Sequence, residues 1–151
     1  MRIFRDVEGL QKAVGERLGE SDWLAIDQDR VDGFADATGD HQWIHVDPER
    51  ARNGPFGTTI AHGFLTLSLI PAMVESALEI RNLRMSINYG LNRVRFPAPV
   101  PVDSRLRARV KLLACDPMDD GGTQTSWLVT VEREGSDRPV CVAETVARRY
   151  A

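Results

Sequence analysis

Cysteine is scarce in this sequence, and its two cysteines are not arranged as a metal or redox pair. Cys115 and Cys141 lie in apolar surroundings, far apart in the chain and without CxxC spacing. Thiols in such positions behave as small apolar core residues. We therefore expect two buried free thiols rather than a disulfide or a thiolate metal site.

Clustered positive charge is also missing. The 19 Lys and Arg residues are outnumbered by 22 Asp and Glu residues, so the formal net charge at pH 7 is −3. The arginines between Arg93 and Arg109 are interrupted by apolar residues, as on the solvated face of strands. Phosphate backbones require a basic surface, so we expect no nucleic-acid partner.

Charged residues are absent from Asn53 to Val74, which raises the question of a membrane span. The first third, "NGPFGTT", has the composition of a turn. Only residues 60–74, "IAHGFLTLSLIPAMV", are apolar enough for a helix, about 22 Å long at the usual rise per residue. We interpret this segment as a helix buried on nearly every side, and expect no membrane association. The first ten residues have no apolar run of signal-peptide length, so we expect a cytoplasmic protein.

The length and composition are those of one folded unit. The chain has 151 residues, of which 42% are apolar and 27% charged, and it contains no repeat. That size suffices for one substantial hydrophobic core. We predict a single domain over residues 1–151.

The first half of the sequence predicts short helices. An amphipathic segment covers residues 6–14, and residues 23–26 have strand character. In "DQDRVDGFADATG" Asp27 can cap a helix, Val31, Phe34 and Ala35 form its apolar stripe, and Gly39 can end it in a left-handed turn.

After the apolar helix the period of the pattern changes from 3.6 to 2. In residues 104–114, "SRLRARVKLLA", basic and apolar residues alternate, as in a strand with one wet face. Three further runs have strand character, at residues 86–96, 125–134 and 138–150. The pattern predicts a meandering antiparallel sheet curled around the apolar helix, an α+β fold.

A polar cluster at residues 37–51, "ATGDHQWIHVDPERA", holds Asp40, His41, His45 and Asp47. It could be a metal site, a proton-transfer pair or ordinary loop polarity. Zinc binding by His41 and His45, with Asp40 and His62, would need a helix that brings both rings to one side. Gly39 and the loop-like "QWI" argue against that helix, so we expect no metal.

The sequence contains "FADATGDHQWIH" and, further on, "FGTTIAHGFLTLSL". These two motifs resemble those of the MaoC-like dehydratases, or R-specific enoyl-CoA hydratases, of the hotdog fold, and the resemblance covers about residues 20–150. Gln42 stands where the family usually has Asn, and Trp43 where it has Pro, a variant similar to the nodulation protein N-like branch. The residues that match the hydratase motif are Phe34, Gly39, Asp40, Ile44 and His45.

Hydration of an enoyl thioester needs one group that takes a proton from water, one that supplies a proton to the α-carbon, and a donor for the carbonyl oxygen. Asp40 and His45 can serve as the proton-transfer pair. The N–H of Gly63, at the start of the predicted apolar helix, can hold the oxyanion, and glycine lets the substrate approach closely. The resemblance implies the same catalytic roles for these three residues and an R-specific hydro-lyase activity.

The remaining expectations concern substrate and assembly. The resemblance suggests that Gln42 positions substrate or the catalytic pair, and it points to a homodimer that acts on acyl-CoA thioesters without a separate cofactor. A hotdog thioesterase and a non-catalytic acyl-binding module stay open as alternatives. One or two of Arg93, Arg95, Arg105, Arg107 and Arg109 could meet the phosphates of coenzyme A. The predicted substrate-binding residues are Gln42, His62, Asn88, Tyr89 and Asn92.

Overall fold

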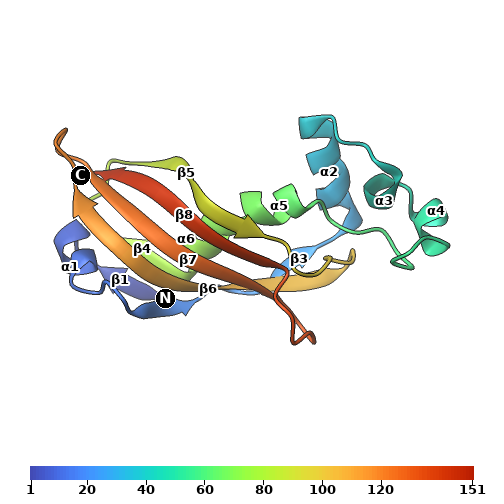
Figure 1. Cartoon of the computed structure of the whole chain (residues 1–151), viewed down its shortest axis with the longest axis horizontal. Coiled ribbons are helices and arrows are strands. Elements are labelled where there is room, and N and C mark those ends of the chain that lie inside the picture. Colours follow the sequence, from blue (N-terminus) through green and yellow to red (C-terminus); the bar gives the residue numbers. More distant parts are fainter.

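In the computed structural model, which describes residues 1–151, a six-stranded antiparallel sheet curves around a central helical segment (Figure 1). The strand order is β2-β6-β7-β8-β5, and β3 pairs with a second part of β6. This confirms the predicted α+β architecture of a sheet wrapped around a helix. The strands are β2 (Arg17–Glu20), β3 (Leu24–Ile26), β5 (Met85–Arg95), β6 (Ser104–Pro117), β7 (Thr123–Arg133) and β8 (Cys141–Tyr150).

The alternating sequence of β6 determines which face of the sheet is buried. Leu106, Val110 and Leu112 are fully buried and form part of the core cluster. Val110 lies opposite Val129 of β7, which is also fully buried. Because side chains alternate along a strand, the basic residues between them face outward. Both cysteines are buried and free, as predicted.

The meander is confirmed for β6, β7 and β8, but β5 pairs with β8 rather than with β6, the next strand in sequence. The connection explains this difference. Pro97, Pro99 and Pro101 lie between the two strands, and they lack the N–H groups of a hairpin ladder. The connection therefore does not form a hairpin between β5 and β6. Strand β5 lies instead at the edge of the sheet, beside β8.

The central segment consists of two helices, α5 (Gly63–Ser68) and α6 (Ile70–Ala77), rather than the one continuous helix predicted for residues 60–74. Pro71 cannot donate a hydrogen bond to the preceding turn, which favours a break at Leu69. Burial on all sides was also wrong, since Phe64 is 68% exposed. One flank packs on the sheet through Leu65, Ile70 and Met73, and the other is open. No helix of the chain has both the length and the apolar character needed to cross a membrane.

The N-terminal residues add a pairing that the sequence pattern did not predict. Strand β1 (Arg2–Phe4) runs parallel to β4 (Leu78–Ile80), which follows α6 directly. The helix α1 (Val7–Gln11) begins after Asp6, whose carboxylate accepts a hydrogen bond from the Gly9 N–H at 2.8 Å. It confirms the predicted amphipathic segment in shorter form.

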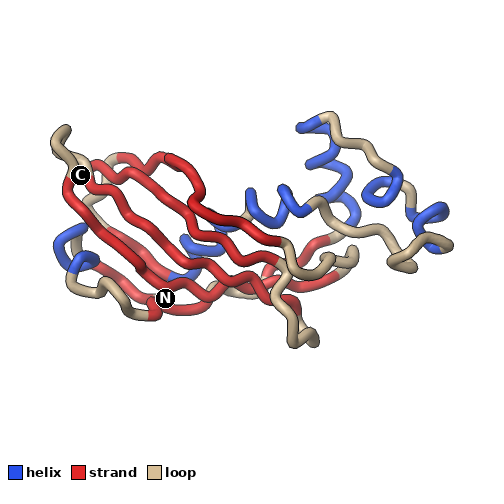
Figure 2. Tube along the Cα trace, in the orientation of Figure 1, coloured by secondary structure: helices blue, strands red, loops and turns tan.

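Three further helices extend beyond one end of the sheet (Figure 1; Figure 2). In α2 (Gln28–Thr38), Asp27 caps the N-terminus and Gly39 ends the helix at φ 80°, both as predicted. The segment "QWI" was wrongly interpreted as loop-like, because Trp43 begins the one-turn helix α3 (Trp43–Val46). Helix α4 (Pro48–Arg52) follows, capped by Asp47, whose carboxylate accepts from the Arg50 N–H.

Candidate active site

Asp40, His45 and His62 come together where the helical extension meets the start of α5. Their potential ligand or proton-transfer atoms all lie within 4.8 Å of one another. The two imidazoles stack with their centroids 3.8 Å apart and are buried, whereas Asp40 is exposed. The structure thus brings the predicted pair together and adds His62 to it.

The left-handed turn at Gly39 and a hydrogen bond from His62 hold Asp40 in place. His62 Nε2 donates to the carbonyl oxygen of Asp40 at 2.9 Å. A carbonyl only accepts, so Nε2 of His62 carries a proton, and the other ring nitrogen is Nδ1. This Nδ1 is buried and has no partner within the chain. Phe34 packs edge-on against the ring, with centroids 4.9 Å apart.

His45 has the geometry of a neutral proton acceptor. Its Nδ1 donates to the carbonyl oxygen of Ile60 at 2.6 Å, so Nε2 carries the free lone pair. Burial lowers the pKa of His45 below its ordinary value, and the neighbouring His62 lowers it further. The Ile60 carbonyl and the Asp40 charge act in the opposite direction but do not reverse the shift. His45 is therefore mainly uncharged at neutral pH.

Gln28, the first residue of α2, links the segments that carry the two histidines. Its Nε2 donates to the carbonyl oxygen of His45 at 2.7 Å, and its Oε1 accepts from the hydroxyl of Thr59 at 2.6 Å. Thr59 is fully buried and precedes Ile60, the acceptor of the His45 ring. Sequence reasoning missed Gln28, because a glutamine in the first turn of a capped helix carries no distinguishing pattern.

A pocket of about 450 Å³ opens beside these residues. Gly63 is the first residue of α5, so its N–H has no acceptor inside the helix. A Cβ at this position would lie 3.1 Å from the ring of Phe96, so only glycine leaves the space free. The residues that line the pocket are Phe34, Thr38, Asp40, His45, His62, Gly63, Phe64 and Phe96.

The other residues of the polar cluster lie around this pocket without lining it. His41 is exposed and bonds to Asp36 at 2.9 Å, and this contact raises its pKa. His41 therefore does not join His45, with which it was considered as a zinc ligand. Gln42 sits at the N-cap of α3, where its backbone N–H reaches the Asp40 carboxylate at 3.4 Å. Its side chain is exposed and makes no capping bond.

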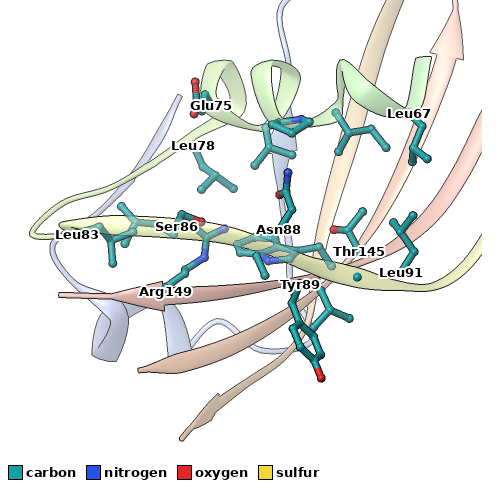
Figure 3. A pocket seen from close by; sticks show the side chains of 18 of the residues that line it. Leu67, Glu75, Leu78, Leu83, Ser86, Asn88, Tyr89, Leu91, Thr145 and Arg149 are labelled. Carbon is teal, nitrogen blue, oxygen red and sulfur yellow. Dashed lines mark hydrogen bonds between the residues drawn. The ribbon is translucent and has the colours of Figure 1, made fainter. Parts of the chain in front are cut away.

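The three polar residues of β5 lie away from the catalytic pocket. Asn88 and Tyr89 belong to the wall of a second, larger pocket (Figure 3). Figure 3 shows Asn88 directed toward the helical side and Tyr89 directed away from it. Asn92 lies outside both pockets and donates to Glu144 at 2.8 Å. Its role in substrate binding stays a prediction, and the bulges of β5 interrupt the simple alternation of faces along this strand.

The three arginines of β6 are paired with carboxylates within the chain. Arg107 and Arg109 both contact Glu20 and Glu132. This pattern agrees with the solvated strand face that the alternation indicated. Arg105 pairs with Glu134 at 3.2 Å, whereas Arg93 and Arg95 have no carboxylate within salt-bridge distance.

Comparison with known proteins gives a consistent result. A family model described as a MaoC like domain matches residues 9–134. The 3-hydroxyacyl-thioester dehydratase Z of Mycobacterium tuberculosis is 55% identical over 151 residues, the full length of both chains. Nodulation protein N of Rhizobium leguminosarum is 50% identical over 135 residues, which cover 88% of this chain and 84% of that protein.

Solved structures share the fold at low sequence identity. A monoamine oxidase regulatory protein from Archaeoglobus superposes with a TM-score of 0.80 at 24% identity, over 99% of this chain and 97% of that one. A MaoC-like dehydratase from Rhodospirillum rubrum superposes with a TM-score of 0.70 at 22% identity, over 92% and 94% of the two chains. These likenesses establish the hotdog arrangement of sheet and helix.

Proposed function

The chain belongs to the MaoC-like domain family, and we propose that it is a hydro-lyase that interconverts trans-2-enoyl-CoA and (R)-3-hydroxyacyl-CoA. The full-length relative at 55% identity is named a 3-hydroxyacyl-thioester dehydratase, and this name supports the proposed reaction class. The observation that carries the proposal is the neutral His45 beside Asp40 and the helix-start amide of Gly63, all in one pocket. The R configuration rests on the family.

His45 is the proton carrier in this proposal. Its Nε2 takes a proton from water while the oxygen of that water adds to the β-carbon of the substrate. The electrons of the double bond move to the thioester oxygen, which the Gly63 N–H holds. The imidazolium then returns its proton to the α-carbon, so one water is added in total. Asp40 orients the water and stabilises the imidazolium by its charge.

The same residues do not require a metal for this reaction. The Nδ1 of His45 and the Nε2 of His62 each bond to a backbone carbonyl. One nitrogen of each ring remains free, and the proton transfers described above use Nε2 of His45 and need no cation. We propose metal-independent hydration, and turnover should be unaffected by a chelator.

Crotonyl-CoA separates hydration from the thioesterase alternative. Hydration removes the absorbance of the conjugated enoyl thioester and leaves the thioester intact, whereas hydrolysis releases a thiol that a disulfide reagent detects. We expect loss of enoyl absorbance without thiol release, and a drop of at least about 100-fold in both Asp40→Asn and His45→Gln. Thiol release, or a loss below about tenfold in both variants, would reject the mechanism. Saturable binding of crotonyl-CoA without turnover would favour the non-catalytic acyl-binding module.

We further propose that the protein is a homodimer. The edge strand β5 pairs only on its β8 side, and an open edge is a ready site for pairing with another chain. Light scattering during size exclusion should give about twice 16.8 kDa, and an active monomer would overturn the proposal. Exposed apolar side chains lie along β5 and at the residue that follows it, namely Met85, Ile87, Tyr89, Leu91 and Phe96.

Arg93 and Arg95 are our candidates for the phosphates of coenzyme A. They lie at the end of β5 that leads to Phe96 in the catalytic pocket, and neither has a carboxylate partner. Arg105, Arg107 and Arg109 are already paired with carboxylates. Arg93→Gln should raise KM for crotonyl-CoA more than KM for the matching crotonyl thioester that lacks the phosphates.

A further inference from the structure

The second pocket is a mainly apolar groove of about 780 Å³ between the central helices and strands β5 and β8 (Figure 3). It starts at Leu67 and Ser68, one turn after Phe64, which lines the catalytic pocket. From there it follows α6 away from the catalytic residues. Its apolar wall includes Leu67, Ile70, Pro71, Val74, Leu78 and Leu91.

One cation, Arg149 of β8, belongs to the wall of this groove. Its Nε donates to the hydroxyl of Thr125 at 3.2 Å, and its Nη1 donates to the hydroxyl of Ser86 at 3.3 Å. The guanidinium carbon lies 5.1 Å from the ring centroid of Trp127. All of these partners are uncharged, and no carboxylate of the chain lies within salt-bridge distance of Arg149. Its burial lowers its pKa, although a guanidinium stays charged in proteins.

Arg149 is only partly exposed, and a partly buried cation without an anionic partner is costly, because two hydroxyls satisfy only part of its five donors. The other charged residues of the groove do not neutralise it. Glu79 pairs with Arg81 at 3.1 Å. Glu75 also lines the groove, but it is exposed and forms no ion pair with Arg149. The groove therefore combines apolar walls with an uncompensated positive charge at the end remote from the catalytic pocket.

We propose that Arg149 binds a carboxylate at the far end of the substrate's acyl chain, so that the enzyme accepts ω-carboxyacyl thioesters. This inference rests on the proposed hydratase function. The segment from Gly63 to Leu78 spans about 22 Å at the usual helical rise per residue, so only long acyl chains reach the guanidinium. Two parallel N–H groups of Arg149 can then meet both oxygens of the carboxylate.

The test compares 2-enoyl-CoA esters of equal long chain length that end in a carboxylate, a hydroxyl or a methyl group. For the unmodified protein we expect a KM for the carboxylate ester at least about tenfold below that of the methyl ester, a typical effect of one charge-assisted contact. Arg149→Gln should reduce this ratio to about 1. Arg149→Lys keeps the charge but loses the planar fork, so it should retain part of the preference.

Arg148→Gln is the matched control. Arg148 is the neighbouring arginine of β8. Its guanidinium carbon lies 3.6 Å from the ring centroid of Tyr89, and Arg148 does not line the groove. This variant should keep the preference for the carboxylate ester. Equal KM values for the three esters in the unmodified protein, or a preference that survives Arg149→Gln, would overturn the inference.

Calorimetry with saturated ω-carboxyacyl-CoA, which cannot be hydrated, separates this inference from the proposed activity. Tighter binding of the carboxylate ligand than of its methyl analogue, lost in Arg149→Gln, would support the site even if no enoyl-CoA were turned over. Hydration of crotonyl-CoA without any such difference in affinity would leave the proposed function intact and reject the anion site.

Discussion

Gln28 holds the catalytic histidine from outside the pocket, and its replacement tests how far the site depends on that support. Its side chain donates to the carbonyl oxygen of His45 and to the carboxylate of Asp32, and it accepts from the hydroxyl of Thr59. Leucine at this position has similar size but no polar group. Gln28→Leu therefore removes the link between α2, α3 and the segment that leads to Ile60, whose carbonyl orients the His45 ring.

The cost can be estimated from the partners that are left behind. Thr59 is fully buried, and a buried hydroxyl without a partner costs about 1–3 kcal/mol. Loss of the bond to the His45 carbonyl adds about 1 kcal/mol. We expect a destabilisation of about 3 kcal/mol, which corresponds to a fall in Tm of roughly 6–12 °C for a chain of this size. Misplacement of His45 should also lower kcat, by roughly ten- to hundredfold, with KM for crotonyl-CoA little changed.

Denaturant unfolding and steady-state kinetics below the transition measure both effects. Gln11→Leu is the control, since Gln11 is exposed on α1 and its side chain has no hydrogen bond in the structure. Thr59→Val in the Gln28→Leu background removes the stranded hydroxyl and should recover about 1–2 kcal/mol. A destabilisation below about 0.5 kcal/mol, or unchanged kcat, would refute the supporting role of Gln28.

Two further outcomes test the catalytic cluster itself. Gln42 stands where the family usually has Asn. If a side-chain amide is needed there, Gln42→Asn should keep most of the activity and Gln42→Leu should lose much of it. Equal rates in the two variants would show that the amide has no role. Because burial lowers the pKa of His45, the rate of hydration should stay constant around pH 7. It should fall only as the pH drops below the ordinary histidine pKa of about 6.5, when the ring becomes protonated, and a profile that already falls above that value would contradict a neutral His45.

The sheet could be predicted from the sequence because alternation is a local property. Each apolar residue of β6 identifies the buried face of that strand, whatever strands lie beside it. Alternation carries no information on neighbours, however, so the pairing of β5 with β8 was not predicted. The parallel pair β1 and β4 was missed for another reason. Each strand has only three residues, too few to show a period.

The pairing of the catalytic residues could be predicted where they are close in the sequence. Asp40 and His45 lie on either side of one short turn, and the motif placed them together. The stacking of His62 on His45 depends on a long-range contact. The segment before α5 packs against α3, and the His45–Ile60 hydrogen bond joins the two. No periodicity encodes such a contact. Arg149 was missed because a basic residue near the end of a strand is ordinary, and only the fold shows that it faces an apolar groove.

Gly63 allows a test in which stability and catalysis are expected to respond differently. In Gly63→Ala the new methyl group would lie 3.1–3.2 Å from the ring of Phe96, a contact that requires the ring to move by a few tenths of an ångström. Phe96 is 39% exposed and lies outside the sheet ladder, so it can yield, and alanine is the better helix former. The free energy of unfolding should therefore change by less than about 1 kcal/mol.

The methyl group would nevertheless fill the approach to the Gly63 N–H, where the thioester oxygen is held in our mechanism. We expect kcat/KM for crotonyl-CoA to fall by at least about tenfold, part of the typical value of an oxyanion donor. The variant Phe96→Leu is the control for a change at the ring. If Gly63→Ala kept kcat/KM within twofold of the unmodified protein, the substrate carbonyl would not bind at this amide.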